Sequence, residues 1–212
     1  MALLLSLSLI IAMLIALICW AGARRAGGSF IKWSGALLIC ALVVEVIALV
    51  LRSCGLHNTL LYNIFTCIEL LFFLRLVKVM VPDRKRAVTM SGAVGLIAMA
   101  VNYVRYKEPD FLLTEGIIIV AAIMTGWSMV VLWRAAQHSE RPLIRTPSFW
   151  FYMGAMVYFG GIVPFVGMMF YLYQNDRHLT ALLYGIINVL AVLRYLLTAW
   201  AYRLARAQRM WE

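Results

Sequence analysis

The fold is decided by a pattern that residues 60–86 show in full, LLYNIFTCIELLFFLRLVKVMVPDRKR. The apolar run from Leu60 to Val81 is close to the ~20 residues that cross a bilayer as a helix. A short turn follows at once and carries Arg84, Lys85 and Arg86. An apolar run that ends in a basic turn is typical of a transmembrane helix whose last residues lie at the cytoplasmic surface.

The same pattern recurs along the chain and predicts seven membrane spans. The apolar runs are Ala2 to Ala23, Ile31 to Cys54, Leu60 to Val81, Ala87 to Val104, Phe111 to Trp133, Phe149 to Tyr173 and Leu179 to Tyr202. The loops between them are too short for a further domain. We therefore expect an all-α, polytopic membrane protein that forms a single seven-helix transmembrane domain over residues 1–212.

The basic residues predict the orientation of these helices. Thirteen of the nineteen Lys and Arg residues fall in every second gap between the runs: Arg24, Arg25, Lys32, Lys78, Arg84, Lys85, Arg86, Arg134, Arg141, Arg145, Arg203, Arg206 and Arg209. The other gaps hold only Arg52, Arg105, Lys107 and Arg177. Short loops rich in Lys and Arg stay cytoplasmic, so we expect the N-terminus outside and the C-terminus in the cytoplasm, in a cell inner (plasma) membrane.

The composition agrees with a membrane location. The chain is 65% hydrophobic and 13% charged, with a mean hydropathy of +0.91, so the lipid bilayer is its expected solvent. A net charge of +10 would suit nucleic acid, but the charges lie at predicted helix ends, where topology and anionic lipid explain them. We expect no nucleic-acid partner, and a cytoplasmic or membrane protein partner would bind through the basic inner loops. The sequence Ala21-Gly22-Ala23 resembles a signal-peptide cleavage site, but Arg24 and Arg25 follow directly, so we expect the first run to be retained as a helix.

The sequence contains no motif for metal binding, cofactor binding or the common enzyme reactions. The four cysteines form no CxxC pair and the three histidines have no metal-ligand spacing, so neither a metal nor a cofactor is expected. Hydrolase, metalloprotease and nucleotide-binding signatures are missing, so we do not expect an enzyme. A retinal protein is excluded as well, since the predicted seventh helix carries no lysine.

Charged residues near the middle of the predicted spans are Glu45, Glu69, Arg75 and Arg194, with Glu115 shallower. Each costs about 3 kcal/mol at mid-membrane on insertion scales, so such residues are normally paired or functional. Counting 1.5 Å per residue, we expect Glu69 and Arg194 to be close enough in depth to pair, with Glu45 as the competing partner. The pair is either a proton or ligand switch or a salt bridge that only fixes helix packing.

Polar side chains surround these charges on two predicted helix faces. Tyr62, Thr66, Glu69 and Phe73 share one stripe of the third helix with Asn63 beside it, and Tyr184, Asn188, Ala191 and Tyr195 share one stripe of the seventh. If these faces meet, they line a polar pocket that opens outward and suits a small-molecule ligand. The alternative is a purely structural role, in which these side chains make ordinary interhelical hydrogen bonds.

Two further features concern helix packing. Gly160, Gly161 and Pro164 follow Tyr158 in the sixth helix and predict a kink or hinge. Ala87, Ser91 and Gly95 form a strip of small residues on the fourth helix, where another helix, internal or from a second protomer, can approach closely.

Three short motifs carry a resemblance to a known group of proteins. They are residues 57–69, HNTLLYNIFTCIE, Pro147-Ser148-Phe149-Trp150 and Tyr158-Phe159-Gly160-Gly161. The chain resembles small, uncharacterised bacterial seven-helix membrane proteins that are often encoded near sensor kinases. The resemblance implies a role in sensing and marks Tyr62, Glu69, Trp150 and Tyr158.

The leading hypothesis is therefore an integral membrane sensor or accessory subunit, in which an intramembrane polar cluster signals to a separate effector. Two alternatives remain open. The chain is otherwise a small-solute transporter or substrate-binding membrane subunit, or a structural subunit of a membrane complex.

Overall fold

The computed structural model describes residues 2–26, 28–106, 112–138, 142–175 and 177–209. Over these residues the chain forms no strand, and seven of its helices are long and apolar enough to cross a membrane. They are α1 (Ala2–Ala23), α2 (Ser29–Ser53), α3 (Thr59–Met80), α4 (Lys85–Tyr106), α5 (Thr114–His138), α6 (Pro147–Asn175) and α7 (Arg177–Arg209). The predicted all-α fold with seven spans is confirmed, and the predicted start of the fifth span at Phe111 lies outside the described residues.

The helix ends follow from local sequence. Gly55 adopts a φ of 71° just after α2, and the amide of Leu56 donates to the carbonyl oxygen of Leu51 at 2.9 Å. This is the Schellman arrangement, which satisfies carbonyls that the helix leaves unpaired and favours glycine at the left-handed position. Pro82 follows α3 within two residues and Pro147 is the first residue of α6, both positions where proline's missing amide is tolerated.

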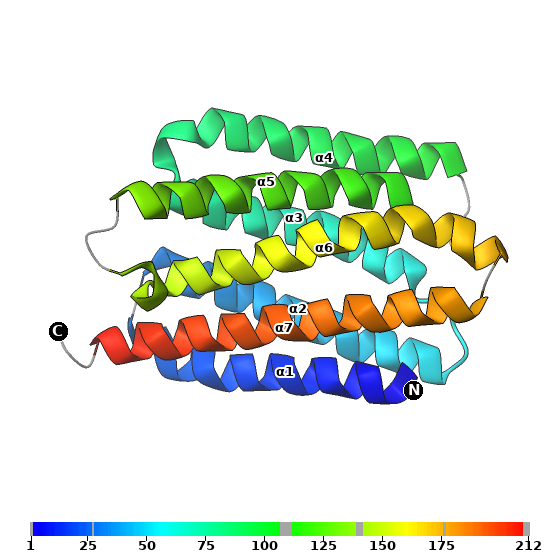
Figure 1. Ribbon diagram of the computed structural model, residues 1–212, viewed down its shortest axis with the longest axis horizontal. Helices are drawn as coiled ribbons and strands as arrows, with labels where there is room; N and C mark the ends of the chain where they lie inside the picture. The colour runs from blue at the N-terminus through cyan, green and yellow to red at the C-terminus, as the bar shows by residue number, and fades with distance from the viewer. Residues whose placement is uncertain (1, 27, 107–111, 139–141, 176, 210–212) are drawn as a thin grey trace.

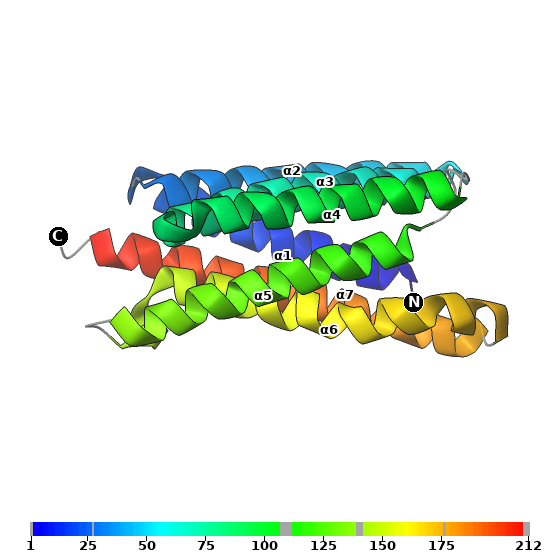
Figure 2. The ribbon, with the colours of Figure 1, turned by 90° about the horizontal axis from the view of Figure 1, so that it is seen from above.

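The helices form a closed bundle with parallel long axes. Each helix packs against the next along the chain, and α7 also packs against α1, which closes the ring. Figure 2 shows α2, α3 and α4 along one side and α5, α6 and α7 along the other. Figure 1 shows the N-terminus and the C-terminus at opposite ends.

The basic loops gather at the end of the bundle where α7 finishes. The turns from α1 to α2, from α3 to α4 and from α5 to α6 all lie at this end, which we call the basic end (Figure 1). The opposite end, where α1 begins, is called the outer end, after the orientation that the sequence predicts. The charge alternation of the sequence is thus a separation between the two ends of the folded molecule.

The interior consists of two apolar clusters. The larger centres on α3, α5 and α6 and includes Phe73, Tyr152 and Phe159, whose rings meet edge to face at 5.7 and 5.9 Å between centroids. The smaller joins α1, α2 and α7 and includes Met13 and Tyr195. Tyr158 packs against both clusters, so the region around it is where the two halves of the interior meet.

The strip of small residues on α4 is used inside the bundle. A side chain at Gly95 would meet Leu70 of α3 at 2.6 Å, and Ser91 accepts a hydrogen bond of 2.8 Å from Nε1 of Trp127 on α5. Ala87 is exposed near the basic end. Of the two partners that the sequence left open for this strip, the internal one is therefore correct for Ser91 and Gly95.

At Gly35 the nitrogen-bearing edge of the Trp20 indole lies against the α2 backbone. A Cβ at Gly35 would lie 1.9 Å from Nε1 of Trp20, which donates to the carbonyl oxygen of Ile31 at 2.9 Å. The indole is held by this hydrogen bond and has little room to move. Glycine is therefore required at position 35 for α1 and α2 to pack.

We predict opposite effects for two glycine-to-alanine substitutions in this bundle. Gly35→Ala forces the Trp20 indole out of place and should lower the free energy of unfolding by several kcal/mol, as overpacking does at its upper range of about 3 kcal/mol or more. Gly126→Ala meets no atom within 4 Å and should raise it by about 0.5–1 kcal/mol, the usual gain within a helix. Thermal unfolding of the purified protein in detergent measures both, and a Gly35→Ala protein as stable as wild type would contradict the packing described here.

Candidate functional site

The buried ion pair joins α3 to α7 across the interior of the bundle. Nη1 of Arg194 lies 2.7 Å from Oε1 of Glu69, and the side chains are only 6% and 9% exposed. The contact is an ion pair by distance, while its angles fall outside those of a hydrogen bond. The predicted pairing of Glu69 with Arg194 is confirmed, and its role as a switch stays a prediction.

Three aromatic rings surround the guanidinium of Arg194. Its Cζ lies 4.6 Å from the ring centre of Phe159, 5.0 Å from that of Tyr158 and 5.4 Å from that of Tyr195. A desolvated cation over an aromatic face gains about 2 kcal/mol, so the rings offset part of the cost of burying the charge. We call Glu69, Arg194 and these three aromatic residues the central cluster.

Glu45 of α2 is the second carboxylate near the central cluster. Its Oε2 accepts a hydrogen bond of 3.1 Å from the hydroxyl of Tyr62 on α3, rather than pairing with Arg194. Glu45 interacts electrostatically with Glu69 and with Arg52, and it is half-buried. Two carboxylates thus face this region, and only Glu69 has an arginine within 4 Å among the described residues.

A line of polar side chains leads from Glu45 to the outer end. Tyr62 lies in the first turn of α3, and Arg52 lies in the last turn of α2. Nη1 of Arg52 donates to the hydroxyl of Ser6 on α1 at 2.9 Å. Glu69 lies about 15 Å below the start of α3. We call Ser6, Arg52, Tyr62 and Glu45 the outer polar line, because they connect the outer surface with the level of the buried pair.

The outer residues of the two predicted stripes make local contacts, and the pocket between the stripes stays a prediction. Oδ1 of Asn63 accepts from the backbone amide of Leu113 at 3.2 Å, before the start of α5. Nδ2 of Asn188 donates to the carbonyl oxygen of Tyr184 in its own helix at 3.0 Å, and Tyr184 is 50% exposed. Asn63 therefore fixes the loop before α5, and Asn188 bonds within its own helix. The inner parts of the two stripes do come together, since Glu69 of α3 and Tyr195 of α7 both contact Arg194.

The glycine and proline residues of α6 have separate roles. A Cβ at Gly161 would lie 2.8 Å from Leu190 of α7, and one at Gly160 would lie 3.4 Å from Thr125 of α5. Both glycines thus allow neighbouring helices to approach α6. Pro164 is exposed within an unbroken helix, and α6 changes direction along its length (Figure 1). The predicted bend is present, and its role as a hinge stays a prediction.

The central cluster is connected to the basic end through α6 and α7. A Cβ at Gly154 of α6 would lie 3.2 Å from the carbonyl oxygen of Arg194, so the two backbones are in close contact beside the cluster. Near the end of α7, Nε2 of Gln208 donates to the carbonyl oxygen of Arg145 at 2.7 Å. Arg145 closes the short 3-10 turn η3 (Leu143–Arg145) that precedes α6. One continuous helix therefore carries both the buried cation and a contact to a loop at the basic end.

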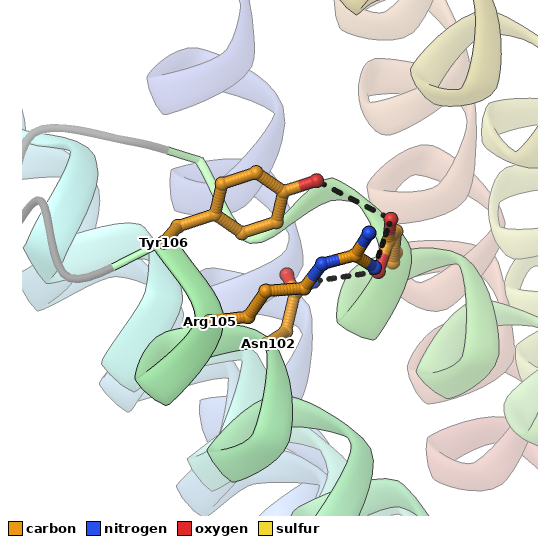
Figure 3. Close-up of polar contacts among 4 residues, drawn as sticks. Asn102, Arg105 and Tyr106 are labelled. Atoms are coloured by element: carbon orange, nitrogen blue, oxygen red, sulfur yellow. Dashed lines mark hydrogen bonds and ion pairs between the residues drawn. The ribbon is translucent and has the colours of Figure 1, made fainter.

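The remaining intramembrane charges lie apart from the central cluster. Arg75 is exposed and stacks over the ring of Trp33 on α2 at 5.2 Å. Glu115, at the outer end of α5, accepts hydrogen bonds from Asn102, Arg105 and Tyr106 of α4 (Figure 3). Among the described residues, no group of three or more His, Cys, Asp or Glu side chains is placed to hold a metal ion.

Comparison with known proteins assigns the chain to no family. No protein-family model, no curated protein and no solved structure matches the chain. The site therefore has to be judged on its own geometry.

Sequence reasoning missed two contributors to the site. Phe159 makes the closest ring contact with Arg194, and Gly154 permits the approach of α6 to α7. The YFGG sequence at positions 158–161 contained a usable signal, because an aromatic pair beside small residues is suited to covering a buried cation from a neighbouring helix.

Single and double substitutions of the buried pair measure two different quantities. The single ones measure the cost of leaving one buried charge unpaired, and the double one measures the net contribution of the ion pair to stability. Glu69→Leu or Arg194→Leu alone leaves one buried charge uncompensated and should lower the free energy of unfolding by about 3–5 kcal/mol. The double substitution removes both charges and should restore most of that loss, since apolar replacement of a buried pair is often close to neutral. Thermal unfolding in detergent measures the cycle.

Arg75→Leu is the matched control for this cycle, because it removes an arginine that is exposed within the same helix as Glu69. We expect no comparable loss, because removing Arg75 leaves no buried charge uncompensated. Additive losses in the double substitution would show that the two side chains are not coupled.

Proposed function

We propose that the protein is an integral membrane sensor or accessory subunit that signals to a separate effector and is not itself an enzyme. Its input is a proton or a small polar ligand that arrives along the outer polar line. Its switch is the central cluster, and its output is a change at the basic end. The resemblance to bacterial seven-helix proteins encoded near sensor kinases points in the same direction.

The observation that carries the proposal is that two carboxylates lie near one buried guanidinium, which pairs with only one of them. Glu69 is matched by Arg194, whereas Glu45 is held by the hydroxyl of Tyr62 at 3.1 Å. Glu45 can gain or lose a proton, or bind a cationic ligand group, while the Glu69 ion pair remains intact. A change at Glu45 acts on the cluster electrostatically, because Glu69, Tyr158 and Tyr195 all interact with it through space.

The tight contact of α6 with α7 supports transmission to the basic end. Tyr158 and Phe159 of α6 cover the guanidinium of Arg194, so a displacement of that side chain changes how the two helices pack. The bond between Gln208 and the Arg145 carbonyl then moves with α7. A loop whose position depends on one helix is a suitable contact for an effector.

We further propose that the basic end faces the cytoplasm, in a bacterial inner membrane. Arg24, Arg84, Arg86 and Arg203 are exposed at this end, where anionic lipids or an acidic partner surface would meet them. The N-terminus then lies outside, and ligand or proton enters from the periplasmic side.

Cys54 tests the orientation without any engineered residue. It is exposed at the outer end, whereas Cys19, Cys40 and Cys67 are half-buried within helices. A membrane-impermeant maleimide added to intact spheroplasts should modify the wild-type protein, and Cys54→Ser should abolish the labelling. Labelling that appears only after the membrane is permeabilised would reverse the orientation.

The proposed switch predicts a pH response at the loop before α6. In lipid nanodiscs, acidification should protonate Glu45, weaken its bond with Tyr62 and raise amide exchange in residues 143–150 roughly fivefold, the effect of losing about one hydrogen bond. Hydrogen–deuterium exchange, corrected for the intrinsic pH dependence of exchange, measures this. Glu45→Gln should exchange fast at both pH values.

Asp83→Asn is the control, because it removes a carboxylate at the basic end that pairs with Arg134 and lies off the outer polar line. It should keep the wild-type response. A pH response that survives in Glu45→Gln would refute Glu45 as the input. Purification in mild detergent followed by native mass spectrometry should recover a bound effector, and Glu69→Gln and Arg194→Leu should abolish its response while the protein still inserts.

A further inference from the structure

A groove lies between α4 and α5 near the outer end, away from the central cluster. Its volume is about 320 Å³, and its walls include Val94, Ile97, Val101 and Ile119, with Asn102 and Glu115 at one end. The four apolar side chains are 40–61% exposed, so the groove is open along its side. It extends about 12 Å along α4 from Val94 to Asn102. This shape suits a linear apolar chain.

At the polar end of the groove Glu115 lines the wall, and Arg105, which lies just outside the lining, reaches its carboxylate. Nη1 of Arg105 lies 3.2 Å from Oε2 of Glu115, and both side chains are more than half exposed, at 66% and 52%. Asn102 donates to the same oxygen at 3.0 Å, and it is buried. Figure 3 shows Asn102, Arg105 and Tyr106 of α4, whose side chains all bond to the Glu115 carboxylate.

The two charges differ from the ion pair at the other end of the same helices. Asp83, in the turn just before α4, pairs with Arg134 near the end of α5, with Nη2 of Arg134 2.7 Å from Oδ2 of Asp83. Neither of these residues lines the groove. An exposed ion pair is weak, so Arg105 and Glu115 can separate at little cost when each finds an opposite charge on a ligand.

We propose that this groove binds one aminophospholipid molecule. Its acyl chain lies along Val94, Ile97 and Val101, its phosphate accepts hydrogen bonds from Arg105, and its primary ammonium donates to Glu115. Asn102 holds the carboxylate in position during this exchange. A phosphatidylglycerol headgroup has no ammonium and would leave Glu115 facing a phosphate, and a choline headgroup has no N–H to donate to the carboxylate.

The test is a lipid titration of the full-length protein in mild detergent, followed by native mass spectrometry. The probes are phosphatidylethanolamine, phosphatidylcholine and phosphatidylglycerol with identical acyl chains. We expect one phosphatidylethanolamine per chain, bound roughly threefold to fivefold more tightly than either of the others, the size of an exposed charge interaction. Glu115→Gln should remove this preference and retain weak binding of all three lipids.

Two further variants separate the groove from its polar end. Ala98→Phe fills the groove and should weaken binding of every lipid, whereas Asp83→Asn, which breaks the ion pair at the opposite end, should leave binding unchanged. Equal affinity for the three lipids, tighter binding of phosphatidylglycerol, or a preference that persists in Glu115→Gln would overturn the proposal. Thermal unfolding confirms that each variant is folded, and the outcome is independent of the switch at Glu45.

Discussion

The contact between Glu69 and Arg194 is the constraint on which the arrangement of the interior depends. A charge within a bilayer costs several kcal/mol unless an opposite charge lies beside it. The helices therefore have to pack so that these two side chains meet. Arg194 emerges from a helix that packs mainly against α1 and α6, and it reaches α3 across the centre of the bundle. The pair thereby joins the two apolar clusters, and the rings of Tyr158, Phe159 and Tyr195 close around it. The polarity of the interior is concentrated at one level.

The helices and the buried pair could be predicted from sequence for one shared reason. Lipid tolerates neither unpaired backbone groups nor unpaired charges, so apolar runs must be helices and two opposite charges at similar depth must find each other. No comparable rule determines how each helix is rotated about its own axis. Large apolar side chains point outward as readily as inward, as Ile18 and Met90 do at 73% and 70% exposure. A helix that is apolar all round carries no periodic signal for its buried face. For that reason the partners of Asn63 and Asn188 could not be predicted, and the rings around Arg194 were only partly anticipated.

The two ends of the bundle are built for different surroundings. At the basic end arginine and lysine side chains are exposed, and Arg134 alone among the described basic residues there has a carboxylate within 4 Å. At the outer end the polar groups are linked to one another, through Ser6 with Arg52, Tyr62 with Glu45, and Glu115 with its α4 partners. Mutual pairing makes the outer end receptive to an uncharged or zwitterionic molecule. Unpaired cations make the basic end receptive to an anionic surface.

The energetics of a buried pair suit a switch that is driven by a small input. Moving a two-state equilibrium from 1:99 to 99:1 takes about 5.5 kcal/mol of differential interaction. Leaving one member of a buried ion pair unmatched costs about 3–5 kcal/mol, which is most of that amount. A proton or ligand that alters the field at Glu69 therefore acts where the bundle is most sensitive to charge. In the proposed function the continuous helix from Arg194 to Gln208 would be the mechanical path, because Gln208 donates to the carbonyl oxygen of Arg145 in the loop before α6.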